Sequence, residues 1–208
     1  MKPKTIFLVR ALAVAAFVAS IGAAFGQAQI LTFDDLSFIG VFGQIPNGYG
    51  GLQWNNFLVL NTAREFSSLG DDGGVNGVVS PPNVAFNANG NSAFISDGAF
   101  NLNSAYLMAA WNDGLKVRVK GFVGTTLAYD NTYTVNTQGS SLINFNYFGV
   151  DEVIFNSFGG VPHGFTTGSG AQFGMDNLSI TLVPEPSTFA LIGLVVIIQT
   201  LRCLTTLR

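Results

Sequence analysis

The stretch Leu115-Lys116-Val117-Arg118-Val119-Lys120 alternates apolar and cationic side chains without a break. Successive side chains of a β-strand point to opposite faces, so a period of two places Leu115, Val117 and Val119 on a buried face and the three cations in water. A strand with one wet face is typical of an antiparallel sheet. The stretch therefore predicts an antiparallel, half-exposed sheet as the basic element of the fold.

Outward from this strand, short β-rich runs recur about every ten residues between clusters of Gly, Asn and Pro. No window of helical period between residues 30 and 183 is long enough to predict a helix. About ten strands and the 19 Phe of the chain can form two facing sheets around an aromatic core, so we expect an all-β sandwich. The Gly-rich runs 70–77 and 159–170 are expected to be turns. The expected strands are 31–36, 52–60, 84–87, 93–96, 105–111, 115–120, 125–130, 132–136, 142–148, 150–156 and 173–183.

Charged side chains are scarce, at 10% of the residues against about 25% in an ordinary soluble domain. Residues 27–183 contain four Lys or Arg and eleven Asp or Glu, which is a formal charge of −7. Nucleic-acid binding needs clustered cations that displace counterions from phosphates, so we expect no nucleic-acid partner. The sole cysteine, Cys203, lies outside this range. Burial, or a metal ion, therefore has to hold the core without disulfides.

The N-terminal segment has the three parts of a secretory signal peptide. Lys2 and Lys4 precede an apolar run, and small residues follow it up to Gly26. We expect residues 1–26 to be a signal peptide that is cleaved after Gly26 or Ala28. The alternative is a retained membrane helix, for which the apolar run is short.

The C-terminal segment begins with the stiff sequence Pro184-Glu185-Pro186. Each proline drives the residue before it toward an extended conformation and donates no backbone hydrogen bond, so Glu185 is expected on a protease-accessible strand. The apolar run 189–201 follows, and as a helix its 13 residues span about 20 Å, less than the ~30 Å hydrocarbon core. Arg202 and Arg208 come next. We therefore expect a short transmembrane helix with a cytoplasmic C-terminus, which holds the protein only temporarily.

This order of Pro-Glu-Pro motif, apolar helix and terminal arginines resembles the sorting signal of PEP-CTERM proteins, the substrates of exosortases in Gram-negative bacteria. The resemblance implies three parts: a signal peptide over 1–26, a β domain over 27–183 and a sorting tail over 184–208. It further implies that the secretion machinery exports the chain and that the tail inserts transiently into the inner membrane. An exosortase would then cut near Pro184-Glu185-Pro186 and leave the mature protein at the cell surface or in the extracellular matrix.

Three segments of the middle region are similar to segments that recur in exported PEP-CTERM proteins, namely residues 32–36, 45–57 and 173–178. Those proteins have no assigned activity, and their domains look like jelly-roll carbohydrate-binding modules. The resemblance implies a jelly-roll-like β-sandwich that binds extracellular polysaccharide. It does not extend to residues 61–112.

The same resemblance suggests a structural calcium ion. In many jelly-roll modules the first and last strands lie close together, and Ca²⁺ takes six to eight oxygen ligands. The side chains that could surround it at the two ends of the domain are Asp34, Asp35, Asp176 and Asn177. The alternative is that these residues cap turns and solvate strand ends.

A sugar-binding platform is a second candidate site, formed by Tyr49, Trp54 and Trp111. Aromatic faces stack on the C–H groups of pyranose rings, and the asparagines beside these residues can bond sugar hydroxyls. The alternative is that the three rings belong to the core, where Trp and Tyr at strand ends are commonly found.

Catalytic patterns are nearly absent from the sequence. His163 is the only histidine and lies in a predicted turn, and no Gly-x-Ser-x-Gly motif accompanies it. A glycosidase needs two carboxyl groups, one with a raised pKa, for which Glu65, Asp151 and Glu152 are the available acids. Solvated acids are the simpler interpretation.

We therefore expect an exported, non-enzymatic protein that binds polysaccharide at the cell surface or in the matrix. Two alternatives stay open: a secreted carbohydrate-active enzyme on the same scaffold, and a structural matrix protein without a ligand.

Overall fold

Antiparallel strands make up most of the chain that the computed structural model describes, which is residues 26–166 and 168–184. Within these residues there are also two α-helices, α2 (Thr62–Leu69) and α3 (Gly73–Gly77), and two 3₁₀ turns, η1 (Tyr49–Gly51) and η2 (Ala88–Gly90). The predicted all-β class is confirmed. The strands are β1 (Ala28–Leu31), β2 (Phe42–Gln44), β3 (Gln53–Asn55), β4 (Phe57–Asn61), β5 (Asn83–Asn87), β6 (Ala93–Ala109), β7 (Asn112–Asp113), β8 (Leu115–Val123), β9 (Thr126–Val135), β10 (Ser141–Phe158), β11 (Val161–Pro162) and β12 (Phe173–Leu182).

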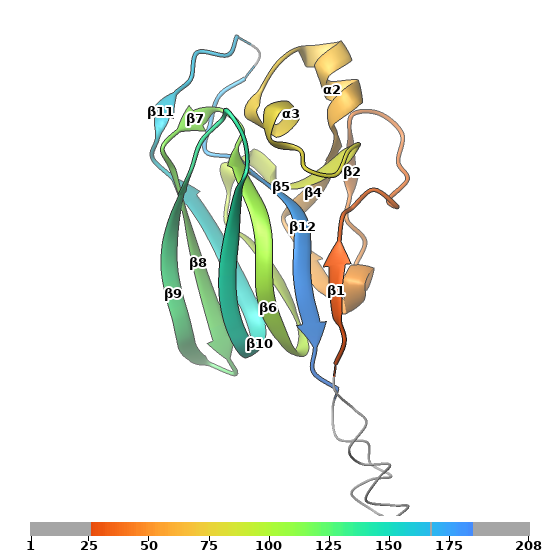
Figure 1. Ribbon diagram of the computed structural model, residues 1–208, viewed down its shortest axis with the longest axis vertical. Helices are drawn as coiled ribbons and strands as arrows, with labels where there is room; N and C mark the ends of the chain where they lie inside the picture. The colour runs from red at the N-terminus through yellow and green to blue at the C-terminus, as the bar shows by residue number, and fades with distance from the viewer. Residues whose placement is uncertain (1–25, 167, 185–208) are drawn as a thin grey trace, which may run out of the picture. The chain divides into compact units, whose positions relative to one another are not determined.

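Ten of these strands form one hydrogen-bonded sheet in the order β2-β4-β5-β12-β6-β10-β8-β9, with β1 added to β12 and β3 to β6. The sheet folds over on itself because β6 and β10 are long and bent. The first half of β10 pairs with the second half of β6, where Ser141 lies opposite Leu107. Its second half pairs with the start of β6, where Phe155 lies opposite Ala93, and with β8 on its other edge. Figure 1 shows the teal and cyan halves of β10 in different layers, so the sheet is an antiparallel sandwich.

The bends in β6 and β10 explain why several predicted strands are merged. Register shifts interrupt the β6–β10 pairing between Asn144 and Glu152. Asn146 and Gly149 adopt φ angles of 53° and 64° there, which bend a strand without ending it. The predicted pair 142–148 and 150–156 is therefore the single strand β10. In the same way β6 joins two predicted strands, and β9 joins two more.

An aromatic core lies between the two layers, as the abundance of phenylalanine predicted. Phe57 meets the rings of Phe155 and Phe173 edge to face, with centroids 5.6 and 6.1 Å apart. Phe155 continues the cluster to Phe145 at 6.3 Å. Such edge-to-face pairs are favourable beyond the area that they bury.

Strand β8 has the alternation of buried and exposed side chains that its sequence predicts. Leu115, Val117 and Val119 are completely buried. Arg118 is exposed on the other face and forms an ion pair with Asp130 of the neighbouring strand β9 at 2.5 Å.

The first predicted strand, 31–36, is wrong beyond Leu31. The chain turns at residues 32–36, where Phe33 has a φ angle of 64° and its carbonyl oxygen accepts a hydrogen bond from the Leu36 amide at 3.1 Å. Burying the Phe33 ring, which has no exposed surface, stabilises this turn although the side chains alternate as in a strand.

The absence of helices was also predicted wrongly. Helix α2 has eight residues and α3 has five, so both are shorter than the windows in which a helical period becomes visible. Packing on the sandwich stabilises helices of this length, because isolated helices so short are unstable in water.

Residues 27–183 form a compact unit of their own. Among the helices that the structure describes, none combines the length and the apolar character needed to span a bilayer. The predicted signal peptide lies outside the described residues apart from Gly26, the sorting tail lies outside them apart from Pro184, and the apolar run 189–201 lies entirely outside them.

Candidate functional site

Helix α2 begins at a polar cap that directs its side chains. The side-chain oxygen of Asn61 accepts a hydrogen bond from the Arg64 amide at 3.0 Å. The Arg64 guanidinium then donates from Nη1 to the carbonyl oxygens of Phe38 (3.0 Å) and Gly40 (2.8 Å) in the preceding loop. Glu65, the next residue, turns toward the interior, where only 4% of its surface is exposed.

Helix α3 lies directly against the sandwich because it is built from glycines. Asp72 caps it, since its Oδ1 accepts a hydrogen bond from the Val75 amide at 2.9 Å. A Cβ atom on Gly73 would collide with the Ala109 carbonyl oxygen of β6, so only glycine permits this approach. The run 70–77, predicted as a turn, therefore contains a short helix.

The two helices bring Glu65 and Asp72 together as a hydrogen-bonded pair of carboxyl groups. Asp72 is 2% exposed. Burial first, and then the charge and hydrogen bond of the neighbouring Asp72 carboxyl, together raise the pKa of Glu65 to about 9. Burial also raises the pKa of Asp72. Two buried carboxylates in contact do not both ionise, so the pair retains a proton at neutral pH.

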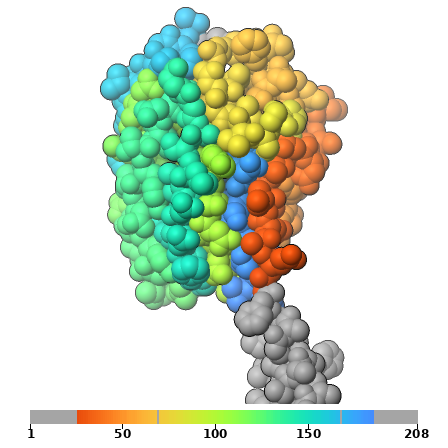
Figure 2. Space-filling view, in the orientation of Figure 1, coloured from red at the N-terminus to blue at the C-terminus, as the bar shows by residue number. Residues whose placement is uncertain are grey.

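The carboxyl pair forms part of the wall of a cavity of about 120 Å³. The cavity lies at the end of the sandwich that carries α2, α3, β7 and β11, which we call the helical end (Figure 1). Figure 2 shows the gold atoms of the two helices filling one side of this end. Phe42, one of the residues that line the cavity, is itself 47% exposed at the surface. The walls include the rings of Phe42, Phe86 and Trp111 and the polar side chains of Glu65, Asp72 and Gln172.

Apart from the proton shared within the carboxyl pair, two buried oxygen atoms of these lining residues accept no hydrogen bond from an amide, amine or hydroxyl group of the described chain. They are Oε2 of Glu65 and Oε1 of Gln172. An acceptor that is buried without a donor costs about 1–3 kcal/mol. A ligand that brings donors into the cavity is therefore favoured.

Trp111 borders the cavity with a half-buried indole ring. Gly168 packs flat against this ring, because a Cβ atom there would collide with it. The ring of Phe165 meets it edge to face at a centroid distance of 6.2 Å. The loop that contains both residues thus holds the indole in place beside the cavity.

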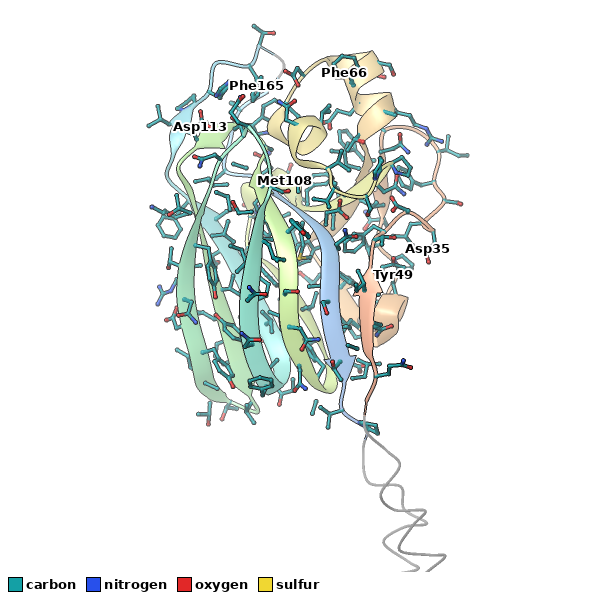
Figure 3. All side chains as sticks on the ribbon, in the orientation of Figure 1. Asp35, Tyr49, Phe66, Met108, Asp113 and Phe165 are labelled. Carbon is teal, nitrogen blue, oxygen red and sulfur yellow. The ribbon has the colours of Figure 1, made fainter. Side chains whose placement is uncertain are left out.

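A histidine–aspartate clasp fixes the neighbouring loops at the helical end, where Figure 3 shows Asp113 beside Phe165. His163 Nδ1 lies 2.6 Å from Asp113 Oδ2, and Thr137 donates to Asp113 Oδ1 from its amide (3.0 Å) and its hydroxyl (2.7 Å). These bonds, first that from His163, lower the pKa of Asp113 to about 2. When Nδ1 of His163 carries the ring proton and donates it to Asp113, Nε2 of His163 accepts a hydrogen bond from Gln138 Nε2 at 3.1 Å. Both ring nitrogens are therefore engaged, and neither is free to act as a base.

Two of the residues predicted to bind calcium are instead joined by hydrogen bonds to the chain. Asp176 is completely buried, and its Oδ2 accepts from the amides of Val79 and Ser80, both at 2.8 Å. The Ser80 hydroxyl donates to Asp176 Oδ1 (3.1 Å) and to Asn177 Oδ1 (2.9 Å). The carboxylate thus anchors the connection between α3 and β5.

The other two predicted ligands have separate partners. Asp34 Oδ1 accepts from the Asn83 amide at 3.0 Å, and Asp35 Oδ1 accepts from the Tyr49 hydroxyl at 2.8 Å. In residues 26–166 and 168–184, no three His, Cys, Asp or Glu side chains gather as a metal site. The predicted calcium set is therefore not assembled, because each acid satisfies a nearby backbone or hydroxyl donor.

The predicted sugar platform is divided between the core and the helical end. Trp54 is 7% exposed, its Nε1 donates to the Tyr49 carbonyl oxygen at 2.9 Å, and its ring meets Phe33 edge to face at 5.7 Å. Tyr49 packs against the same cluster and donates its hydroxyl to Asp35, which lies beside it in Figure 3. The structure therefore places Trp54 and Tyr49 with the core cluster, and it places Trp111 in the wall of the cavity at the helical end.

The remaining acids considered for catalysis lie apart from this cavity. Glu152 is half-buried on β10, and Asp151 Oδ2 accepts from the Gly124 amide at 2.5 Å. The cavity instead unites Glu65 with Asp72 and Gln172, which the sequence did not single out. The sequence contained one indication for Asp72, because an aspartate before a short run of residues is a common helix N-cap. No feature of the sequence indicated that Asp72 contacts Glu65.

No protein-family model and no curated protein matches this sequence. Among solved structures, the chain is similar to a DUF4465 family protein from Bacteroides caccae, with 10% identity and a TM-score of 0.50 over 74% of this chain and 98% of that one. A DUF4465 family protein from Bacteroides ovatus has 10% identity and a TM-score of 0.41, over 75% of this chain and 94% of that one.

The chain also resembles the N-terminal tandem CBM22-1–CBM22-2 domain of Paenibacillus barcinonensis Xyn10C, with 14% identity and a TM-score of 0.38. That match covers 80% of this chain and 48% of the other. At these identities the likeness concerns the fold alone. The chain is therefore an antiparallel β-sandwich whose fold is similar to that of the Bacteroides caccae protein.

Proposed function

We propose that residues 27–183 form a jelly-roll-like domain that binds polysaccharide without cleaving it, in a protein exported to the cell surface or the extracellular matrix. The cavity at the helical end is the binding site. It combines aromatic rings with buried oxygen acceptors that lack donors, and this combination carries the proposal.

The chemistry of the cavity complements that of a sugar. A pyranose presents C–H groups, which pack on aromatic rings such as Trp111, and hydroxyl groups, which donate hydrogen bonds. Glu65 Oε2 and Gln172 Oε1 are acceptors that could receive hydrogen bonds from such hydroxyl groups. The cavity of about 120 Å³ is close to the ~150 Å³ that hold a benzene molecule, so it admits one edge of a single sugar unit.

A carbohydrate-active enzyme on the same scaffold is the second candidate, because burial raises the pKa of Glu65 as a general acid requires. The spacing of the two acids opposes it. Glycosidases keep their carboxyl groups about 5 Å apart or more, whereas Glu65 and Asp72 are in direct hydrogen-bond contact. Binding without turnover is therefore the better interpretation.

A glycan array followed by an assay for reducing ends tests this function. We expect the purified full chain to be retained on at least one polysaccharide without releasing reducing ends. Trp111→Ala should abolish retention, whereas Glu152→Gln, a change outside the cavity, should leave it intact. Release of reducing ends that Glu65→Gln abolishes would establish the enzyme instead, and neither retention nor release would indicate a structural matrix protein.

Export and sorting are supported by the sequence alone. The leader of residues 1–26, Pro184-Glu185-Pro186 and the apolar run 189–201 occur in the order that a secretion pathway and an exosortase would use. We expect transient insertion into the inner membrane and then removal of the tail. An epitope placed after Arg208 should be lost from the surface-exposed protein in a host with an exosortase, and an epitope that persists there would contradict the processing.

A further inference from the structure

We propose that the cavity at the helical end selects a sugar unit with a free amino group, whose ammonium is held by Glu65, Asp72 and Gln172. This inference rests on the proposed binding of polysaccharide and names the class of sugar that the site prefers.

The lining residues Glu65, Asp72 and Gln172 carry carboxyl and amide oxygens that can accept hydrogen bonds. Glu65 is 4% exposed, and apart from the proton shared with Asp72 its Oε2 receives no amide, amine or hydroxyl donor from the described chain. The buried Oε1 of Gln172 is likewise without a donor. The Asp72 carboxyl belongs to the lining of the same cavity. A primary ammonium group has three donors, and these three side chains can supply acceptors for them.

The charges around the pair also favour a cation. None of the described residues that line the cavity is Lys, Arg or His. Arg64, although next to Glu65 in sequence, is turned away and bonded to two loop carbonyls. Asp71, which precedes Asp72, adds to the negative potential at that acid. An ammonium group would therefore be the positive charge that this pair lacks, and the proton shared by the two acids would leave to solvent as it binds.

The apolar part of the lining favours an organic cation over a metal ion. Ca²⁺ requires six to eight oxygen ligands, and the cavity supplies fewer, because Phe42, Phe86 and Trp111 form much of its wall. Aromatic rings attract ammonium groups through their faces. The same rings pack on the C–H groups of the sugar that carries the amine.

Gly74 keeps open the space beside the unpartnered acceptor. A Cβ atom at this position would lie 3.7 Å from Glu65 Oε2, 3.3 Å from Leu60 Cδ2 and 3.2 Å from Asp72 Oδ1. Alanine is compatible with the helical backbone of α3, since Gly74 has no positive φ angle. Gly74→Ala therefore adds one methyl group to the site and keeps all three polar side chains, although Asp72 Oδ1 and Leu60 Cδ2 have to shift by a few tenths of an ångström.

Matched sugars test the preference. The probes are glucosamine and galactosamine, their N-acetylated forms, and glucose and galactose, measured by calorimetry on the full chain near pH 6, where the amine is charged. We expect at least one amino sugar to bind about tenfold more tightly than its two counterparts, with release of about one proton per site in buffers of different ionisation enthalpy. Glu65→Gln and Gly74→Ala should each lower its affinity at least tenfold, whereas Glu152→Gln should leave it unchanged.

The outcomes separate this inference from the function on which it rests. Equal affinity for the amino, acetylated and neutral sugars would overturn the amine preference and leave polysaccharide binding standing. Tighter binding of an amino sugar that neither Glu65→Gln nor Gly74→Ala weakens would also overturn it, because the amine would then bind elsewhere. If no probe binds, the inference falls, and the glycan array decides the proposed function separately.

Discussion

The Glu65 carboxyl of α2 is hydrogen-bonded to the carboxyl of Asp72, the residue that caps α3. Both side chains are more than nine-tenths buried. One contact thus joins the two helices, holds a proton at neutral pH and forms the polar wall of the cavity. Its titration should be visible in the stability of the domain.

The domain should become less stable as the pH rises from about 5 to 9. The pKa of Glu65 is about 9 in the folded protein, above its unfolded value of 4.5, so the folded state binds more protons within this window. Its stabilising contribution is complete below the unfolded pKa and is lost as the pH rises through the folded pKa. Glu65→Gln should remove this dependence. Relative to the variant, we expect the wild-type Tm to fall by at least about 4 °C across the window.

Thermal melts followed by circular dichroism measure the difference. Glu152→Gln is the matched control, because Glu152 lies half-buried on β10, outside the cavity. Parallel curves for wild type and Glu65→Gln would show that the buried pair does not retain its proton.

Asp176→Asn should destabilise the domain by about 2–4 kcal/mol. The carboxylate accepts hydrogen bonds from the amides of Val79 and Ser80 while it is completely buried. The asparagine side chain has only one acceptor oxygen. Its NH₂ group would therefore face N–H or O–H donors of Val79 and Ser80 and could not accept their hydrogen bonds. Urea unfolding measures the loss, and Asp97→Asn, at an exposed position, should change stability by less than about 0.5 kcal/mol. A similar small effect for both variants would contradict the anchoring role of Asp176.

Calcium should leave the Tm unchanged. Asp34, Asp35 and Asp176 each accept hydrogen bonds from the chain itself, and they do not form a cluster among the residues that the structure describes. Melts with added Ca²⁺ and with a chelator should therefore coincide. A rise in Tm that saturates with Ca²⁺ would show that the acids are rearranged around an ion.

The two tryptophans should separate stability from binding. Trp54→Ala removes a buried ring from the aromatic core and should cost about 3–5 kcal/mol. Trp111→Ala should cost less than half of this and abolish sugar binding. Trp54→Phe leaves Trp111 as the single tryptophan, so its fluorescence should report ligand binding directly. Unchanged emission from Trp111 at saturating ligand would place the sugar away from the helical end.

Loss of the histidine clasp should release the adjoining loop while the fold persists. In His163→Ala the pKa of Asp113 should rise from about 2 toward its ordinary value, because the hydrogen bond from His163 is the largest influence that lowers it. NMR titration of the Asp113 carboxyl measures this shift. Amide hydrogen exchange in residues 159–166 should become faster at the same time. If the Asp113 pKa does not move, the histidine does not hold that carboxyl in solution.

Much of the fold could be predicted because strand formation and core packing follow the local alternation of side chains. Leu115, Val117 and Val119 are buried as their spacing required. The turn at Phe33 and the helix α2 were missed because burial of one ring, or packing on the sandwich, outweighs local preference there.

The positions of the predicted site residues depend on surroundings that the sequence does not show. Trp54 and Trp111 are the same kind of residue, yet one lies in the core and the other borders a cavity. Asp176 and Glu65 are both buried acids, and only the neighbouring donors distinguish an anchor from a candidate ligand-binding group. Residue type does not encode these surroundings.

By itself the sequence determined the β class, the phenylalanine-rich core and the acidic balance, because these depend on composition and on short-range spacing. The tertiary structure alone decided that Glu65, Asp72, Trp111 and Gln172 share one cavity. That meeting depends on how the bent strands β6 and β10 close the sandwich and on where the two short helices pack at its end, and these are long-range contacts without a local pattern.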